Sequence, residues 1–544
     1  MKKAKYLMLL TALAMTPSVF AIKGKTMWNY IAYEAAFWDK TLPVSAENYP
    51  KLYLDRLASM PIDTLVFTPC FGFGSYAGNL KSSTYPKHQP QAGSDWMRNW
   101  KNGMPELIKQ GGDPIALTVK WCRQYKKEAV LMMPVNLCGH PHNRAPTPKW
   151  VSNSFYCYLY SDFCRNNQDA LMGIGDKGRP PYAEYGECVD YTQPKVRAKF
   201  VENATEILGK YDLDGIVIDF TILPTLFKSV AAGEVASAKE ILLVTEMMTK
   251  IKAACKAAQG RLGHPVDFMA RVPDSIGYCK DIGIDLQGWF DSKLLDGVFL
   301  GGDVQLNRWN VVGDAAAKAG IPWYASFALS GIYVGNDSGY TGDDERLLRQ
   351  SADTYRARIA DVLLCKGSGC MYSQGVHHQH MIPHDAVVPY DAKLNRLGAK
   401  RYFVSYTNDR RAGSSLKDGL KHRSVPSLLS GSPFDLAKGT AKYEISVWEK
   451  LDELKSQGHN PKATLITEVM IPSGVETIVT FNGKEYKPFK KRSGTQLYDI
   501  PLNLVKFGPN EVTVKSKGKN KRGTTAKLGN IAVEITFPQK EAAK

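Results

Sequence analysis

The segment YDLDGIVIDF, residues 211–220, decides the fold of this chain. Its continuous apolar run, Ile216 to Ile218, is typical of a parallel strand that is covered on both faces. The run ends abruptly in the carboxylate of Asp219, with an aromatic residue beside it. An acid at that place costs free energy unless it is exposed, paired or used in chemistry. The segment therefore predicts a buried strand whose last side chain emerges into a site, or else a structural Asp that caps a helix or forms a salt bridge.

The same alternation of strands and helices extends on both sides of this segment, from about residue 26 to residue 374. Strands are expected at residues 27–33, 64–69, 129–135, 215–219, 266–272, 297–300, 322–328 and 369–373. Helices are expected at residues 194–210, 236–258, 311–319 and 344–364. Eight strands separated mostly by helices favour a closed (β/α)8 TIM barrel over an open sheet. No GxGxxG motif follows the first strand, which disfavours a dinucleotide site.

The pattern changes after the eighth expected strand. Short β-rich runs follow residue 463, and they are broken by turn pairs such as Ser473-Gly474 and Asn482-Gly483. Asn-Gly between two β runs is a strong hairpin signal. We therefore expect a barrel with long loops and an extension over residues 22–439, followed by an accessory all-β sandwich over residues 440–544.

The first 21 residues have the pattern of a signal peptide. Lysines precede an apolar run at residues 6–15, and Val19-Phe20-Ala21 places small residues where a signal peptidase needs them. We expect the mature chain to begin at Ile22 and the protein to be periplasmic or secreted. No later stretch predicts a membrane span.

The chain is strongly basic, with a net charge of +17, and much of the excess lies between residues 487 and 527. Such a segment could attract an anionic polysaccharide or an anionic membrane surface, or it could be an ordinary solvated surface. Nucleic acid is not expected as a partner after export. The ten cysteines could form disulfides in an oxidising compartment, and Cys365 and Cys370 are near enough in sequence to pair. There is no CxxC motif that would indicate a zinc knuckle.

Residues that follow the strands of a barrel converge on one mouth. The predicted catalytic pair is Asp219 and Asp303, with Glu34 and Asp274 as weaker choices for the second acid, because two carboxylates that flank a glycosidic bond are the minimum machinery for its hydrolysis. We expect Asp219 to project into an open cavity. Substrate binding is assigned to Glu34, Phe71, Asn136, His140, His142, Arg271, Asp274, Trp323, Gln374 and His377. This mixture of acids, amides, imidazoles and aromatic rings suits a sugar.

Two other functions stay open. His140 and His142 in one loop, with His377, His378 and His380 in another, could hold a metal ion for a metal-dependent hydrolase. We nevertheless assign no metal and no cofactor. A barrel that lacks the second acid would instead be a non-catalytic carbohydrate-binding protein. Serine hydrolysis is a weak option because the chain has no GxSxG motif.

The segment YDLDGIVIDF and the preceding VDYTQPKVR, residues 189–197, resemble the fourth-strand region of glycoside hydrolase family 10-like bacterial barrel proteins. The resemblance extends over much of residues 26–374, with ARVPD (270–274) and MMPVNLCGHPHN (132–143) as weaker matches. It implies an exported glycoside hydrolase that acts on a polysaccharide or oligosaccharide, with Asp219 as the strand-four acid. In family 10 itself an Asn-Glu pair stands at strand four and a second glutamate at strand seven, whereas strand seven here offers Ser326 and Ala328.

Overall fold

The structure is a computed structural model of the 544-residue chain. It describes residues 22–31, 44–70, 72–83, 107–136, 161–173, 188–221, 223–301, 306–328, 351–373, 384–403, 406–407, 419–424, 428–429, 434–492, 494–518 and 523–538. Within these ranges, no helix is both long enough and apolar enough to cross a membrane.

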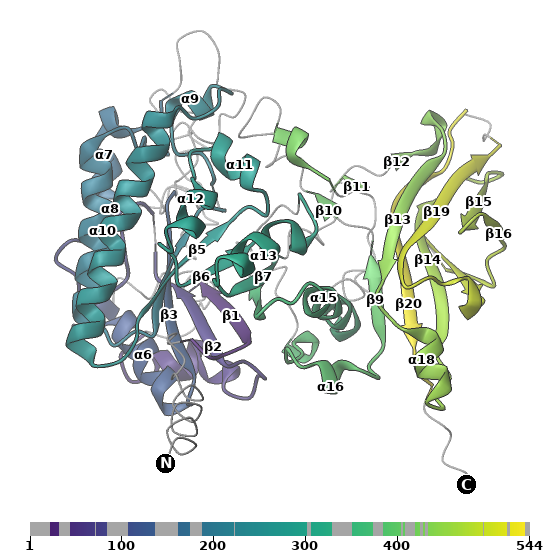
Figure 1. Ribbon diagram of the computed structural model, residues 1–544, viewed down its shortest axis with the longest axis horizontal. Helices are drawn as coiled ribbons and strands as arrows, with labels where there is room; N and C mark the ends of the chain where they lie inside the picture. The colour runs from purple at the N-terminus through teal and green to yellow at the C-terminus, as the bar shows by residue number, and fades with distance from the viewer. Residues whose placement is uncertain are drawn as a thin grey trace, which may run out of the picture.

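Eight parallel strands form a closed barrel, which confirms the predicted fold class (Figure 1). The strands are β1 (Thr26–Ile31), β2 (Thr64–Thr68), β3 (Glu128–Pro134), β4 (Gly215–Asp219), β5 (Asp267–Val272), β6 (Gly297–Leu300), β7 (Trp323–Ala328) and β8 (Gly369–Ser373). β8 pairs with β1 and closes the ring. Every expected barrel strand is confirmed to within two residues at either end.

Helices surround the barrel. The larger ones are α6 (Pro114–Gln124), α8 (Pro194–Lys210), α10 (Ala238–Leu262), α13 (Trp309–Lys318) and α15 (Ala352–Leu364), and Figure 1 shows α8 and α10 side by side on its outside. α8 has the predicted bounds. α10 begins after Ser237, which forms a capping box with Glu240. α15 begins later than the expected residue 344, because the Ser351 side chain caps it by accepting a hydrogen bond from the backbone N–H of Thr354.

Shorter helices lie in the connections. They are α3 (Tyr49–Tyr53), α7 (Asp162–Asn166), α9 (Lys228–Ala231), α11 (Ile276–Asp281), α12 (Leu286–Asp291) and α16 (Ala392–Asn395).

The interior of the barrel contains an apolar cluster. Each strand contributes one or two of its side chains, and Ile22, which precedes β1, contributes another. Its members are Ile22, Met27, Val66, Val130, Met132, Val217, Met269, Phe299, Tyr324 and Met371. Successive side chains of a strand alternate between its two faces. A residue two positions before or after a member of this cluster on the same strand therefore also points into the barrel.

The C-terminal part is a sandwich of two antiparallel sheets, as predicted. One sheet contains β9 (Lys400–Phe403), β12 (Phe434–Asp435), β14 (Lys462–Met470), β17 (Lys490–Arg492), β18 (Thr495–Ile500) and β20 (Lys527–Thr536). The other contains β13 (Ala441–Val447), β15 (Glu476–Phe481), β16 (Lys484–Tyr486) and β19 (Gly508–Lys517). Their inner faces share one apolar core. Asn482 and Gly483, both with positive φ, form the predicted hairpin turn between β15 and β16.

The sandwich begins before the expected boundary at residue 440. β9 and β12 both pair with β20, and Figure 1 shows β9 between α15 and β20. The reason is that β20 would otherwise present an unpaired edge. Lys400 of β9 forms an ion pair of 3.1 Å with Glu449, and Ala357 of α15 is buried in the sandwich core. Arg308 reaches Glu444 at 3.0 Å.

The cysteines that the structure describes are free thiols, and Cys365 and Cys370 do not form the disulfide that their spacing allows. Cys370 is fully buried in the core between the barrel and its helices, where a thiol behaves as a small apolar side chain.

Candidate active site

Six polar side chains lie at the carboxyl end of the barrel interior. Each stands two residues after a member of the apolar cluster on its strand, so each points into the barrel. The six are Asn29, Thr68, Asp219, Arg271, Ser326 and Ser373, which we call the polar cap. All of them are buried. In barrel enzymes this end of the strands carries the chemistry.

Asp219 and Arg271 form the central pair of the polar cap. They lie opposite each other on β4 and β5, and an Arg271 guanidinium N–H donates to Asp219 Oδ2 at 3.1 Å. The other carboxylate oxygen, Oδ1, accepts from the backbone N–H and the hydroxyl of Thr221, both at 2.8 Å. A second guanidinium nitrogen of Arg271 donates to the Ser373 hydroxyl at 3.0 Å. Both oxygens of the Asp219 carboxyl group therefore accept hydrogen bonds.

Two polar atoms of the cap are left without a hydrogen-bond partner among the described residues. They are Arg271 Nε and the Ser326 hydroxyl oxygen. Asn29, by contrast, donates to the backbone carbonyl of Val66 at 3.2 Å. A buried polar group without a partner costs about 1–3 kcal/mol. These two atoms are therefore the ones in the polar cap that can hydrogen-bond to a ligand.

Asp219 does not project into an open cavity as expected, since the residue is 1% exposed and its side chain not at all. The physical reason is that Arg271 and Thr221 occupy both of its oxygens. Because both oxygens of Asp219 already accept hydrogen bonds, acid catalysis at this end of the barrel would need a proton donor other than Asp219.

Asn136 and Asp274 hold loops at the same end of the barrel. Asn136 donates to the carbonyl of Thr225 at 2.7 Å and accepts from the N–H of Val189 at 3.1 Å. The Asp274 carboxylate accepts from the N–H groups of Leu306 and Asn307 at 2.9–3.1 Å. Burial raises the pKa of Asp274 to about 6, although these hydrogen bonds oppose the shift. Both side chains are buried and engaged by the backbone, which argues against the predicted contact with substrate.

Trp323 is placed on the wrong face for a substrate contact. It is 1% exposed and belongs to the core between the barrel and its helices. Methyl groups built on Gly313 and Gly367 would overlap its indole ring, so these glycines make room for it. The next residue, Tyr324, is the one that points into the barrel. The predicted contact assumed that Trp323 faces the mouth, and the alternation of β7 directs it outward.

Seven of the predicted site residues lie outside the described residues. They are Asp303, Glu34, Phe71, His140, His142, Gln374 and His377. Their roles stay predictions, as does the metal site built on the histidine clusters. Within the ranges that the structure describes, no three His, Cys, Asp or Glu side chains are placed to hold a metal ion.

Sequence reasoning missed three members of the polar cap: Asn29, Thr68 and Ser373. Candidates were sought after each strand, whereas these side chains belong to the last inward-facing positions of the strands themselves. A signal was present in the sequence. Each of these strands places a polar residue two positions after an apolar one, as in Met371 and Ser373.

Comparisons with known proteins give no family. No protein-family model matches the chain, and no curated protein matches it. Among solved structures, an α-L-fucosidase isoenzyme from Paenibacillus thiaminolyticus is 12% identical with a TM-score of 0.38, covering 69% of this chain and 51% of its own. This chain thus spans about half the length of that fucosidase.

Two further glycoside hydrolases match at a similar level. A chitinase from Bacillus thuringiensis is 9% identical with a TM-score of 0.34, covering 94% of this chain and 100% of its own. A family 18 N-acetylglucosaminidase from Paenibacillus barengoltzii is 12% identical with a TM-score of 0.35, covering 68% and 99%. Scores of 0.34–0.38 are too low to assign an activity to this chain.

Proposed function

We propose that the protein is a glycoside hydrolase that acts on a polysaccharide or oligosaccharide at the carboxyl-terminal mouth of the barrel. The supporting observation is the buried ion pair of Asp219 and Arg271, at 3.1 Å, in a cap where Arg271 Nε and the Ser326 hydroxyl have no partner among the described residues. Apolar side chains of similar volume are often as stable as a buried ion pair, or more so. A charged pair at this end of a barrel therefore favours a role in chemistry over a role in stability.

In this proposal Asp219 supplies the negative charge that the reaction needs. The glycosidic bond breaks through a transition state that resembles an oxocarbenium ion, and an ionised carboxylate either stabilises that positive charge or attacks it. The proton for the leaving oxygen comes from a second acid. Asp303 is the first choice and Glu34 the next, because Asp274 is engaged by backbone N–H groups. The likeness of YDLDGIVIDF to the family 10-like proteins adds to the proposal.

A non-catalytic carbohydrate-binding barrel is the second candidate. It is favoured by one observation, which is that both oxygens of Asp219 are occupied and its side chain is not exposed. A cap of this kind could offer hydrogen bonds to sugar hydroxyls without cleaving anything.

The release of reducing ends from a panel of neutral and anionic oligosaccharides tests the proposal. We expect turnover by the wild type and its loss in Asp219→Asn. Asp214→Asn is the matched control, because Asp214 immediately precedes β4 and its carboxylate accepts from Arg123 and from the N–H of Ala129. Its activity per folded molecule should equal that of the wild type. Binding of a glycan without turnover by the wild type would favour the second candidate, and equal turnover by Asp219→Asn would refute the assignment of Asp219.

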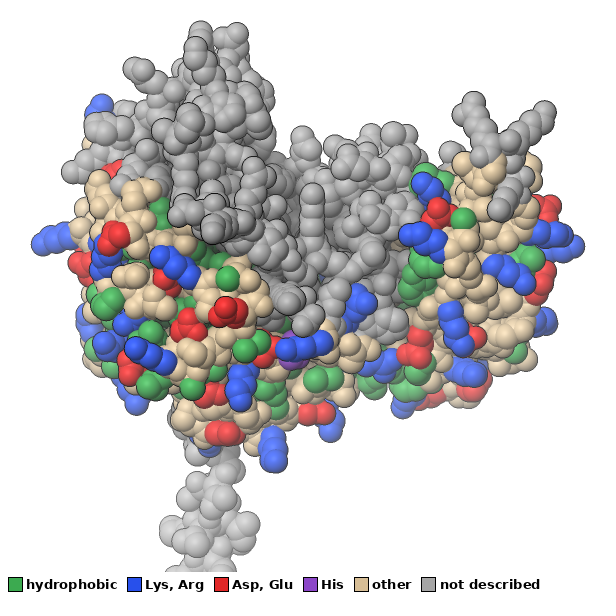
Figure 2. Space-filling model, turned by 90° about the horizontal axis from the view of Figure 1, so that it is seen from above, with side chains coloured by type: hydrophobic (Ala, Val, Ile, Leu, Met, Phe, Trp, Pro, Cys, Tyr) green, Lys and Arg blue, Asp and Glu red, His purple; other side chains and the backbone are tan. Residues whose placement is uncertain are grey.

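Export to the periplasm or beyond, and attraction of an anionic polysaccharide by the basic C-terminal module, are further parts of the proposal. Figure 2 shows basic and acidic side chains interspersed on the face of this module that it presents. Exposed lysines nevertheless lie close together in sequence at Lys487, Lys490 and Lys491. Replacing the three by Gln should weaken binding to an anionic glycan in low salt and leave neutral-substrate turnover unchanged. If binding to the anionic glycan does not change, the basic segment is an ordinary solvated surface.

A further inference from the structure

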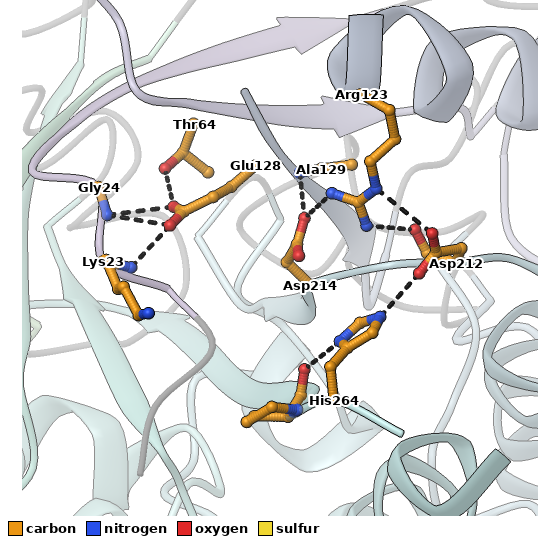
Figure 3. Close-up of polar contacts among 10 residues, drawn as sticks. Lys23, Gly24, Thr64, Arg123, Glu128, Ala129, Asp212, Asp214 and His264 are labelled. Atoms are coloured by element: carbon orange, nitrogen blue, oxygen red, sulfur yellow. Dashed lines mark hydrogen bonds and ion pairs between the residues drawn. The ribbon is translucent and has the colours of Figure 1, made fainter. Parts of the chain in front are cut away.

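Residues 22–26 lie across the amino-terminal end of the barrel and are held there by carboxylates. The backbone N–H of Ile22 donates to Asp267 at 2.9 Å. Those of Lys23 and Gly24 donate to Glu128 at 2.7–3.2 Å, and those of Lys25 and Thr26 to Asp63 at 2.9 Å. Figure 3 shows Lys23 and Gly24 directed at Glu128, which also accepts from the Thr64 hydroxyl. Five consecutive N–H groups thus meet three acids at the starts of the barrel strands.

The Ile22 side chain fills the amino-terminal end of the barrel interior. It is 4% exposed and belongs to the apolar cluster inside the barrel. A methyl group built on Gly215 of β4 would lie 3.3 Å from Ile22 Cδ1. The backbone at Gly24 is packed more closely still, since a methyl group there would overlap Thr64 Oγ1 and lie 2.8 Å from Glu128 Oε2. This tight fit fixes the Ile22 nitrogen beside Asp267, which is itself 4% exposed.

The signal-peptide pattern ends at the residue before Ile22. Val19-Phe20-Ala21 has small residues at the two positions that a signal peptidase requires. We propose that hydrolysis of the bond between Ala21 and Ile22 leaves an α-ammonium group that forms an ion pair with Asp267 inside the amino-terminal end of the barrel. Water supplies a hydroxyl to the Ala21 carbonyl carbon and a hydrogen to the Ile22 nitrogen, which takes up a further proton at neutral pH.

Two consequences follow from the burial of Ile22. Cleavage precedes closure of the barrel, because a peptidase cannot reach a bond whose nitrogen and side chain are enclosed. The mature protein is also more stable than its precursor. An amide nitrogen offers Asp267 one N–H and no charge, whereas an ammonium offers a charge-assisted hydrogen bond.

The mass of the protein purified after export gives the first test, and we expect a chain that starts at Ile22. The second test is a cycle of four proteins: the chain from Ile22 and the chain that keeps Ala21, each with and without Asp267→Asn. We expect Asp267→Asn to lower the Tm of the chain from Ile22 by roughly 2 °C or more beyond its effect on the chain that keeps Ala21. A different start site, or equal losses in the two chains, would overturn the proposal.

Asp63→Asn is the matched control for this cycle. Asp63 accepts from the backbone N–H groups of Lys25 and Thr26, which are amides in both chains. Its effect on Tm should therefore be the same with and without Ala21. If the Asp267 variants fail to fold, labelling of the wild type decides. An amine reagent should modify the α-amino group of the native mature protein at least roughly tenfold more slowly than that of the unfolded chain. The reason is that the group is exposed only when the amino-terminal end of the barrel unfolds. Equal rates would refute the ion pair.

Discussion

At the amino-terminal end of the barrel, carboxylates accept hydrogen bonds mainly from the backbone, whereas at the carboxyl-terminal end Asp219 is paired with a buried arginine side chain in addition to the Thr221 backbone N–H. Asp63 and Glu128 accept from backbone N–H groups, and Asp214 accepts from Ala129 N–H at 2.7 Å. Asp219 is paired with Arg271, whose Nε has no partner among the described residues.

The difference teaches how one fold separates stability from chemistry. A carboxylate that binds the backbone fixes the path of the chain, and the backbone group cannot leave without unfolding. A pair of side chains can exchange partners when a ligand arrives. In the proposed enzyme, the amino-terminal end would hold the barrel together and the carboxyl-terminal end would carry the reaction.

The largest expected effect comes from breaking the side-chain pair. Arg271→Leu leaves the buried Asp219 charge without its cation, which should lower the free energy of unfolding by about 3–5 kcal/mol in denaturant titrations. The double variant Asp219→Leu with Arg271→Leu should recover most of that loss, because apolar replacements of a buried pair are often neutral. A loss below about 1 kcal/mol in the single variant would show that Arg271 does not compensate Asp219.

A second prediction uses Asp274, a carboxylate at the carboxyl-terminal end that is nevertheless satisfied by the backbone. Its folded pKa, raised by burial to about 6, lies above its unfolded value of about 3.9. The folded state therefore binds the proton of Asp274 more tightly than the unfolded state. This tighter binding stabilises the fold below about pH 4, and the stabilisation is lost as the pH rises through about 6. The loss should reach up to about 3 kcal/mol. Unfolding measured against pH should show this decline, and it should be flatter in Asp274→Asn.

Glu128→Gln tests the amino-terminal end. The Glu128 carboxylate accepts from Lys23 and Gly24 N–H and, at 2.6 Å, from the Thr64 hydroxyl. The amide keeps the shape but replaces one acceptor oxygen by an NH2 group, which cannot accept these hydrogen bonds, so the free energy of unfolding should fall by about 2 kcal/mol. Turnover per folded molecule should not change. A loss of activity without a loss of stability would contradict the division between the two ends.

The smallest effect is expected on the outer side of the same end, at His264. Its ring Nε2–H donates to the Asp212 carboxylate at 2.7 Å, as Figure 3 shows. Burial alone would lower the pKa of His264, but the hydrogen bonds to Asp212 and to the Pro265 carbonyl, with the nearby charges of Asp212 and Asp214, together outweigh it and raise the pKa. The stabilisation is present below the unfolded pKa of about 6.5 and is lost as the pH rises through the folded value. Because both side chains are partly exposed, His264→Gln should cost less than about 1 kcal/mol at pH 6 and nothing at pH 9, measured by denaturant titration.

Much of the barrel could be predicted from the sequence because its strands and helices are local patterns. The run from Gly215 to Asp219 and the helix from Pro194 to Lys210 have the predicted bounds. The start of the sandwich could not be predicted in this way. β9 gains its strand conformation from pairing with β20, which lies more than 120 residues later in the chain, so no local pattern announces it.

The residues of the candidate site were also predicted only where a local sequence pattern marked them. Asp219 and Arg271 were found because charged residues stand out at the ends of apolar runs. Asn29, Thr68 and Ser373 were missed because short polar residues in a strand do not stand out, and Trp323 was placed on the wrong face because its orientation depends on the phase of the strand.

The sequence by itself determined that strands and helices alternate and that an acid ends the fourth strand. Only the tertiary structure decided which side chains meet: that Arg271 lies opposite Asp219, that Trp323 faces outward and that Ile22 enters the barrel. The physical reason is that secondary structure follows from interactions between near neighbours in the chain. Contacts inside a barrel depend on strand register, which is fixed only when all eight strands close together.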